Sequence, residues 1–179
     1  MLIKLENLIN GFSDLLGKVS AILLVILLLN VFVDVVMRYL FNDVSIGMQE
    51  MEWHLFSAMF MLGVSYSLRH NGHVRVDIIY ERLPLKKQAL VNILGVMVFL
   101  IPFTLLVTWY GFGYVHESFI LNEQSGDPGG LPYRWLIKSV IPFAFICMTL
   151  SGIGLLLHSV NILRGFHQDD AQHHEKVIP

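Results

Sequence analysis

Long stretches without charged residues, separated by short polar segments, are the main pattern along the chain. A helix needs about 20 apolar residues to cross the roughly 30 Å of hydrocarbon in a bilayer. With their polar flanks counted, four stretches reach that length. The sequence therefore predicts an all-α integral membrane protein with four transmembrane helices, at about residues 19–41, 48–69, 88–115 and 136–158.

The N-terminal segment before the first span, about residues 2–17, alternates in the manner of an amphipathic helix. Its apolar positions share one helical face, and Lys4, Glu6 and Asp14 lie among the polar positions of the opposite face. This pattern predicts a helix lying flat in the membrane interface, with its polar face in water. A solvated helix packed on a partner protein is the alternative. No small-residue cleavage site follows, so the first span is interpreted as uncleaved rather than as a signal peptide.

The distribution of cations predicts the orientation of the spans. Nine of the twelve Lys and Arg residues lie in the N-terminal segment, the connection after the second span and the C-terminal tail. Both termini are therefore expected in the cytoplasm. Residues 1–164 are expected to form a single four-helix membrane domain, followed by a polar cytoplasmic tail at 165–179. The connection at 111–134 contains the turn cluster Ser125–Gly130, for which no regular structure is expected.

The composition excludes several classes of protein. Only 15% of the residues are charged, against about 25% in soluble domains, and the mean hydropathy is +0.62. A net charge of −2 does not suit a nucleic-acid binder, which must neutralise phosphates. The single cysteine, Cys147, excludes a disulfide framework and a zinc site built on thiolates. The motifs of phosphate-binding, hydrolytic and metalloprotease sites are missing, so neither catalytic residues nor a metal site are expected.

Ionisable residues near the predicted outer ends of the first two spans are candidates for function. Asp34 and Arg38 are four residues apart on one helix, which favours a structural ion pair between them. Glu50 and Glu52 open the second span and point about 200° apart. One of these two acids is expected to face Arg38 or a partner protein, and the other to face water.

Four histidines at span ends raise an alternative, because a four-helix membrane protein can hold haem b between paired histidines. His54 and His116 are at similar predicted depth on the outer side, and His70 and His158 on the inner side. Each lies close to an interface, which favours ordinary hydrogen bonding. A haem-bearing anchor of a quinone-linked oxidoreductase is thus the alternative function. A small stand-alone channel or exporter is a third.

Small residues and prolines mark contacts within the spans. Ser151, Gly152 and Gly154 form a small-residue patch on the fourth span, which suits close contact with another helix. Pro102 and Pro142 are expected to start or kink helices.

Several of these features together resemble the small membrane subunit of tripartite ATP-independent periplasmic (TRAP) transporters. The most distinctive match is Gly63 followed by the stretch Arg69-His-Asn-Gly72-His73-Val-Arg-Val-Asp77. Further features fit in order along essentially the whole chain: Arg38-Tyr39, Glu50, Pro84, Leu131-Pro132 before Trp135, and Pro142.

The resemblance implies a subunit that is not an enzyme and needs no cofactor. In that family a large membrane subunit binds substrate and sodium and moves as an elevator, and the small subunit anchors it. A periplasmic binding protein delivers an organic acid, such as sialic acid or a C4-dicarboxylate. The implied partners are therefore the large subunit, the binding protein and membrane lipids, and the implied location is the bacterial inner membrane.

Two groups of residues follow as candidates. The periplasmic docking surface would comprise Arg38, Asp43, Glu50, Glu52, Glu117, Glu123, Asp127 and Arg134. The family-motif group would comprise Asp34, Gly63, Arg69, Gly72, His73, Asp77 and Pro84, with Arg69 and Asp77 as an ion pair that holds the second connection in place.

Overall fold

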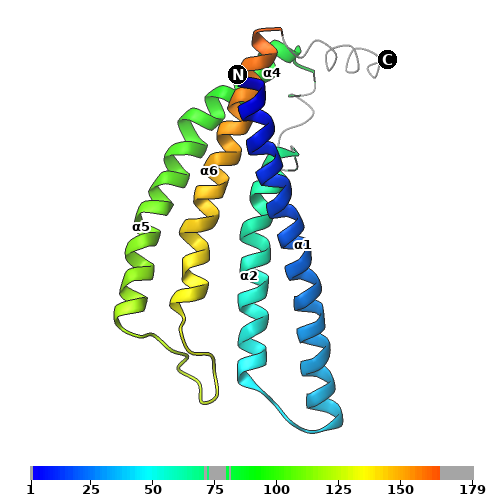
Figure 1. Ribbon diagram of the computed structural model, residues 1–179, viewed down its shortest axis with the longest axis vertical. Coiled ribbons are helices and arrows are strands. Elements are labelled where there is room, and N and C mark those ends of the chain that lie inside the picture. Colours follow the sequence, from blue (N-terminus) through cyan, green and yellow to red (C-terminus); the bar gives the residue numbers. More distant parts are fainter. Residues whose placement is uncertain (1, 71, 73–79, 81, 166–179) are drawn as a thin grey trace.

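The computed structural model describes residues 2–70, 72, 80 and 82–165, and all the regular secondary structure within these ranges is helical, as predicted (Figure 1). The elements follow in order as α1 (Leu2–Leu40), α2 (Ile46–Arg69), α4 (Leu85–Gly95), a π-helical turn η1 (Val96–Leu100), α5 (Ile101–Ile120) and α6 (Trp135–Leu163). Asn42 and Asn122 adopt positive φ just after α1 and α5, a conformation that asparagine tolerates and that ends a helix.

Within the described residues, three helices are long and apolar enough to cross a membrane: α1, the continuous run Leu85–Ile120, and α6. Helix α2 is 24 residues long, but its first turns carry Gln49, Glu50, Glu52 and His54, which lower its hydropathy. The chain is thus a multi-helix membrane protein, and its fourth span stays a prediction.

The predicted boundary between an interfacial helix at 2–17 and a span from residue 19 does not coincide with a break in the helix. Helix α1 runs without interruption through this point, because neither Gly17 nor Lys18 breaks the hydrogen-bonding pattern. The polar face was also expected in water, but part of it packs against the bundle. Glu6 is only 4% exposed, whereas Leu8 is 72% exposed. The change of pattern near residue 18 therefore marks a change of surroundings rather than a turn.

Helix α6 is the centre of the bundle, in contact with α1, α2, α4, η1 and α5. Its buried side chains are mostly small, which lets neighbouring helices approach closely. A Cβ at Gly152 would meet Leu100 of η1 at 2.2 Å, and one at Gly154 would meet Ile9 of α1 at 3.0 Å. The prediction of close helix contact at this patch is confirmed. Ser13 and Ser151 share a buried hydrogen bond of 2.8 Å between α1 and α6.

The π-helical turn η1 lies directly before Pro102. A proline lacks the N–H of a regular helix, and its ring clashes with the carbonyl four residues earlier, so a widened turn at this position accommodates it. Beyond it α5 continues to Ile120, although a connection was expected from Gly111. Gly111 does not break the helix. It packs on Pro142 of α6, where a Cβ would lie 3.2 Å from the proline Cβ.

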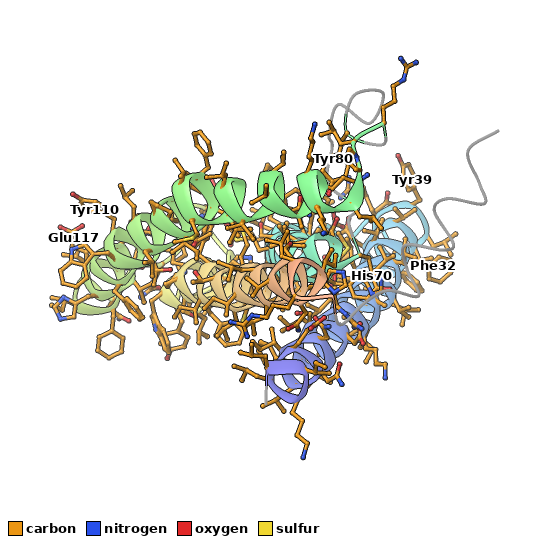
Figure 2. All side chains as sticks on the ribbon, turned by 90° about the horizontal axis from the view of Figure 1, so that it is seen from above. Phe32, Tyr39, His70, Tyr80, Tyr110 and Glu117 are labelled. Carbon is orange, nitrogen blue, oxygen red and sulfur yellow. The ribbon has the colours of Figure 1, made fainter. Side chains whose placement is uncertain are left out.

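Large apolar side chains cover the outer faces of α1 and α5. Phe32 on α1 is 66% exposed, and Phe99 and Trp109 on the other flank are more than 70% exposed. Figure 2 shows Phe32 and Tyr39 on one flank of the bundle and Tyr110 on the opposite one, all directed away from it. Such faces are stable against lipid or a partner protein rather than against water.

Candidate partner-binding surface

The loop end of the bundle is the end that carries the connections 41–45 and 121–134, opposite the N-terminus (Figure 1). Its central group is the Glu50 carboxylate in the first turns of α2. Ser125 donates its hydroxyl to Oε1, Arg134 donates from Nη2 to the same oxygen at 3.2 Å, and the Leu131 N–H donates to Oε2 at 2.6 Å. One carboxylate therefore ties the 121–134 connection to α2.

The 121–134 connection is irregular, as expected, and two of its glycines are required by geometry. Gly129 has a φ of +83°, in the region that favours glycine. A Cβ at Gly130 would lie 2.4 Å from the Ser125 side chain and 2.9 Å from Glu50 Oε2. The backbone can therefore approach the carboxylate only because residue 130 has no side chain.

A second ion pair holds the base of the same connection. Lys138 near the start of α6 pairs with Glu123, and its ammonium lies 4.1 Å from the centroid of the Tyr114 ring on α5. The hydrogen bond from Lys138 holds the pKa of the Glu123 carboxyl below its ordinary value of 4.5. The Arg134 N–H also donates to the Glu123 carbonyl at 3.0 Å. These contacts fix α5, the connection and α6 relative to one another.

Beneath this connection, a groove of about 550 Å³ is lined by residues of α2, α5 and α6. Polar side chains line it close to the connection, and Met61 and Ile141 line it deeper along the helices. Its full lining comprises Ile46, Gln49, Glu50, Trp53, His54, Ser57, Met61, Tyr114, Asp127, Arg134, Ile137, Lys138 and Ile141.

The structure brings only part of the predicted docking surface together. Glu50, Glu123 and Arg134 form the network just described, and Asp43, Glu117 and Asp127 are exposed. Glu117 lies on the flank opposite Tyr39, the neighbour of Arg38 in sequence (Figure 2). The eight residues therefore spread across the whole loop end, with the Glu50 network between exposed charges.

Arg38 was expected to pair with Asp34 and was also a candidate to face Glu50 or Glu52. Arg38 pairs with Asp34 on α1, as their spacing predicts, and Glu50 pairs with Arg134 rather than with Arg38. Glu52 is partly exposed. Asp34 is only 2% exposed, so its carboxylate depends on this arginine for compensation.

The described family-motif residues other than Asp34 lie at or toward the other end of the bundle. Gly63 packs on α1, where a Cβ would lie 3.0 Å from Ser20 Oγ. Arg69 pairs with Asp14 and donates from Nη1 to the Asn10 carbonyl at 2.9 Å. Its predicted partner Asp77 lies outside the described residues, as does His73. Gly72 donates its N–H to the Ser67 carbonyl at 2.9 Å, and Pro84 is the N-cap residue directly before α4.

Three of the four candidate haem histidines make other hydrogen bonds. His54 Nδ1 bonds the Glu50 carbonyl at 2.6 Å, His70 bonds Asp14 at 3.3 Å, and His158 bonds Glu6 at 2.9 Å. His116 is exposed on α5. Within the described part of the chain, no three His, Cys, Asp or Glu residues gather in a way that could hold a metal ion.

Sequence reasoning missed three contributors to the loop-end network: the Ser125 hydroxyl, the Leu131 N–H and the Lys138–Tyr114 contact. The available signal was the count of charges, because Arg38, Arg134 and Lys138 were the only cations predicted on this side. Three cations near several acids are expected to pair with them.

Comparison with known proteins identifies relatives over most of the chain. The family model for "Tripartite ATP-independent periplasmic transporters, DctQ component" matches residues 27–161. A putative TRAP transporter small permease protein of Haemophilus influenzae is 32% identical over 105 residues, which cover 58% of this chain and 64% of the relative. The ectoine TRAP transporter small permease protein TeaB of Halomonas elongata is 24% identical over 167 residues, or 89% of this chain and 81% of the relative. The C4-dicarboxylate TRAP transporter small permease protein DctQ of Vibrio cholerae is 28% identical over 101 residues, which cover 56% of this chain and 43% of the relative.

Proposed function

Because the chain belongs to the DctQ component family of tripartite ATP-independent periplasmic transporters, we propose that it is the non-catalytic scaffold of a sodium-coupled uptake system. In this proposal it anchors a large elevator subunit in the bacterial inner membrane with both termini in the cytoplasm. It also helps to dock a periplasmic substrate-binding protein. The transported substrate is an organic acid of the sialic acid or C4-dicarboxylate class.

The observation that carries the scaffold role is the contrast between the centre of the bundle and its flanks. Helix α6 is packed on several sides through small residues and buried polar contacts, whereas the apolar stretches of α1 and α5 face outward. A bundle fixed internally and apolar on its flanks is suited to hold a second membrane protein in place. The name of the Vibrio relative supports the substrate class, and the name of the Halomonas relative links ectoine to that protein.

The loop end supports the docking role, since it presents exposed charges around a connection fixed by Glu50 and Lys138. Exposed rim charges mainly change the rate of association and its dependence on salt. Those on opposite flanks, such as Asp43 and Glu117, would contact different parts of a docked protein.

Co-purification from native membranes in mild detergent, with an absorption spectrum of the same sample, tests the scaffold. A colourless complex with a much larger multi-span membrane protein is expected. A Soret band would overturn the proposal in favour of the haem anchor, and transport by the chain reconstituted alone would favour a channel or exporter.

Charge reversal tests the docking role. Uptake by Asp43→Lys and Glu117→Lys is expected to fall most at low ionic strength and to recover with salt. Lys4→Glu, an exposed reversal near the N-terminus, is the matched control and is expected to leave uptake unchanged. Equal uptake by all three variants at every salt concentration would contradict a docking surface at the loop end.

A further inference from the structure

The lining of the groove beneath the 121–134 connection changes from polar to apolar along its length. On α2 it extends from Ile46 to Met61, a rise of about 22 Å along the helix. All its charged groups lie at the end near the connection, and the residues furthest from the connection on α2 and α6 are Met61 and Ile141. Such a gradient matches a molecule with a polar head and an apolar chain.

The depth of the groove in the membrane follows from its aromatic side chains. Trp53 and Tyr114 line it near the polar end, and tryptophan and tyrosine are enriched at the level of lipid head groups. Its deeper end therefore lies within the hydrocarbon, because α6 is one of the helices apolar enough to cross the membrane. An apolar space at that depth is filled by an acyl chain more favourably than by water.

The charges around the polar end select the type of head group. Groups of both signs line the groove: two carboxylates, Glu50 and Asp127, and two cations, Arg134 and Lys138, of which Arg134 pairs with Glu50 and Lys138 with Glu123. Arg134 gives one Nη2 donor to Glu50 and has further N–H donors for a phosphate. Asp127 is exposed at the rim and can accept hydrogen bonds from an ammonium. A site that presents separated positive and negative groups suits a zwitterion better than an anion.

We propose that this groove is a specific site for one ethanolamine phospholipid. Its phosphate binds Arg134, its ammonium binds Asp127, and one acyl chain lies along Met61 and Ile141. This site is independent of the proposed transport function, since it requires only that the chain lies in a membrane.

Native mass spectrometry of the full-length chain in mild detergent tests the site. After delipidation, phosphatidylethanolamine, phosphatidylglycerol or inorganic phosphate is added back, and the fraction of chain carrying one bound molecule is measured. The expected result is one phosphatidylethanolamine per chain, at least 10-fold less phosphatidylglycerol, and no competition by inorganic phosphate.

Three variants test the placement of the lipid. Ile141→Trp fills the groove from α6 and is expected to lower lipid binding at least 10-fold. Ile146→Trp, at an exposed position of the same helix outside the groove, is the matched control and is expected to bind as wild type. Ser57→Phe fills the groove from α2 and replaces Ile141→Trp if that variant does not fold.

Asp127→Asn tests the ammonium contact with little risk to folding, and is expected to reduce the preference for phosphatidylethanolamine over phosphatidylglycerol. Equal binding of the two lipids by wild type would overturn the proposal. So would unchanged lipid binding when the groove is filled by a folded variant, or full displacement of the lipid by inorganic phosphate.

Discussion

Two glycines of α1, six residues apart, test whether close packing of α1 on α2 stabilises the bundle. Gly11 has open space where a Cβ would be built, with nothing within 4 Å. A Cβ at Gly17 would lie 2.4 Å from Cδ2 and 2.6 Å from Cγ of the Tyr66 ring on α2. Both positions are inside the same helix, so Gly→Ala has the same effect on helix propensity at each.

The magnitude follows from two opposing terms. Gly→Ala in a helix interior stabilises by about 1 kcal/mol. At Gly17 the new methyl group must displace an aromatic ring, and overpacking of this kind costs about 1–3 kcal/mol. We therefore expect Gly11→Ala to raise the free energy of unfolding. The Gly17→Ala variant should be less stable than the Gly11→Ala variant by about 1–3 kcal/mol. For a chain of this length, that corresponds to a difference in Tm of about 2–12 °C.

Thermal unfolding of both variants in the same detergent, followed by fluorescence, measures this difference. Displacement of the Tyr66 ring also changes its contact with His70, whose ring centroid lies 4.3 Å away. A Gly17→Ala variant as stable as Gly11→Ala would refute the close α1–α2 contact at this point.

Three further predictions concern the ends of the bundle. Because the pKa of Glu123 is lowered in the fold, its ion pair stabilises the protein above the ordinary pKa of 4.5, and this contribution is lost as the pH falls below it. The Tm difference between wild type and Glu123→Gln should therefore shrink on acidification, whereas Glu117→Gln, at an exposed site, should show no such change. Asn161→Ala removes a 2.6 Å hydrogen bond to the buried Glu6 carboxylate and should lower the free energy of unfolding by about 1.5–3 kcal/mol. Thermal unfolding measures this loss, and a Tm equal to that of wild type would contradict the contact. Arg69→Gln breaks a partly exposed ion pair with Asp14, so it should lower the free energy of global unfolding by less than about 1 kcal/mol. It also removes the hydrogen bond to the Asn10 carbonyl, so amide hydrogen exchange around Asn10 should become faster. Unchanged exchange there would contradict the role of Arg69 in holding this part of α1.

The hydrophobic pattern was sufficient to predict most helices, because long apolar runs in this chain have no other stable form in a membrane. It did not predict that α1 is one continuous helix, for a physical reason. A switch from amphipathic to fully apolar residues reports what surrounds a helix, and Gly17-Lys18 contains nothing that would end one. The extent of α5 was missed because Gly111 can either break a helix or allow close packing, and only its neighbour Pro142 decides between these roles.

The loop-end network was less predictable, because its members are far apart in sequence. Glu50 bonds Ser125, Leu131 and Arg134, which lie 75, 81 and 84 residues further along the chain. No local periodicity encodes such contacts. The pairing of Asp34 with Arg38 was predicted because it is set by the helical repeat alone.

The unbroken helix α1 has a consequence for how the protein sits in a bilayer. Its 39 residues make a rod of about 58 Å, nearly twice the roughly 30 Å of hydrocarbon. Even at a steep tilt of about 40°, the rod covers about 45 Å along the membrane normal. It must therefore project beyond the hydrocarbon by about 15 Å or more, and the buried contacts of Glu6 place its first turns against the end of α6. The first helix is therefore longer than the hydrocarbon is thick at any of these tilts, and its N-terminal end is held by contacts with the end of α6.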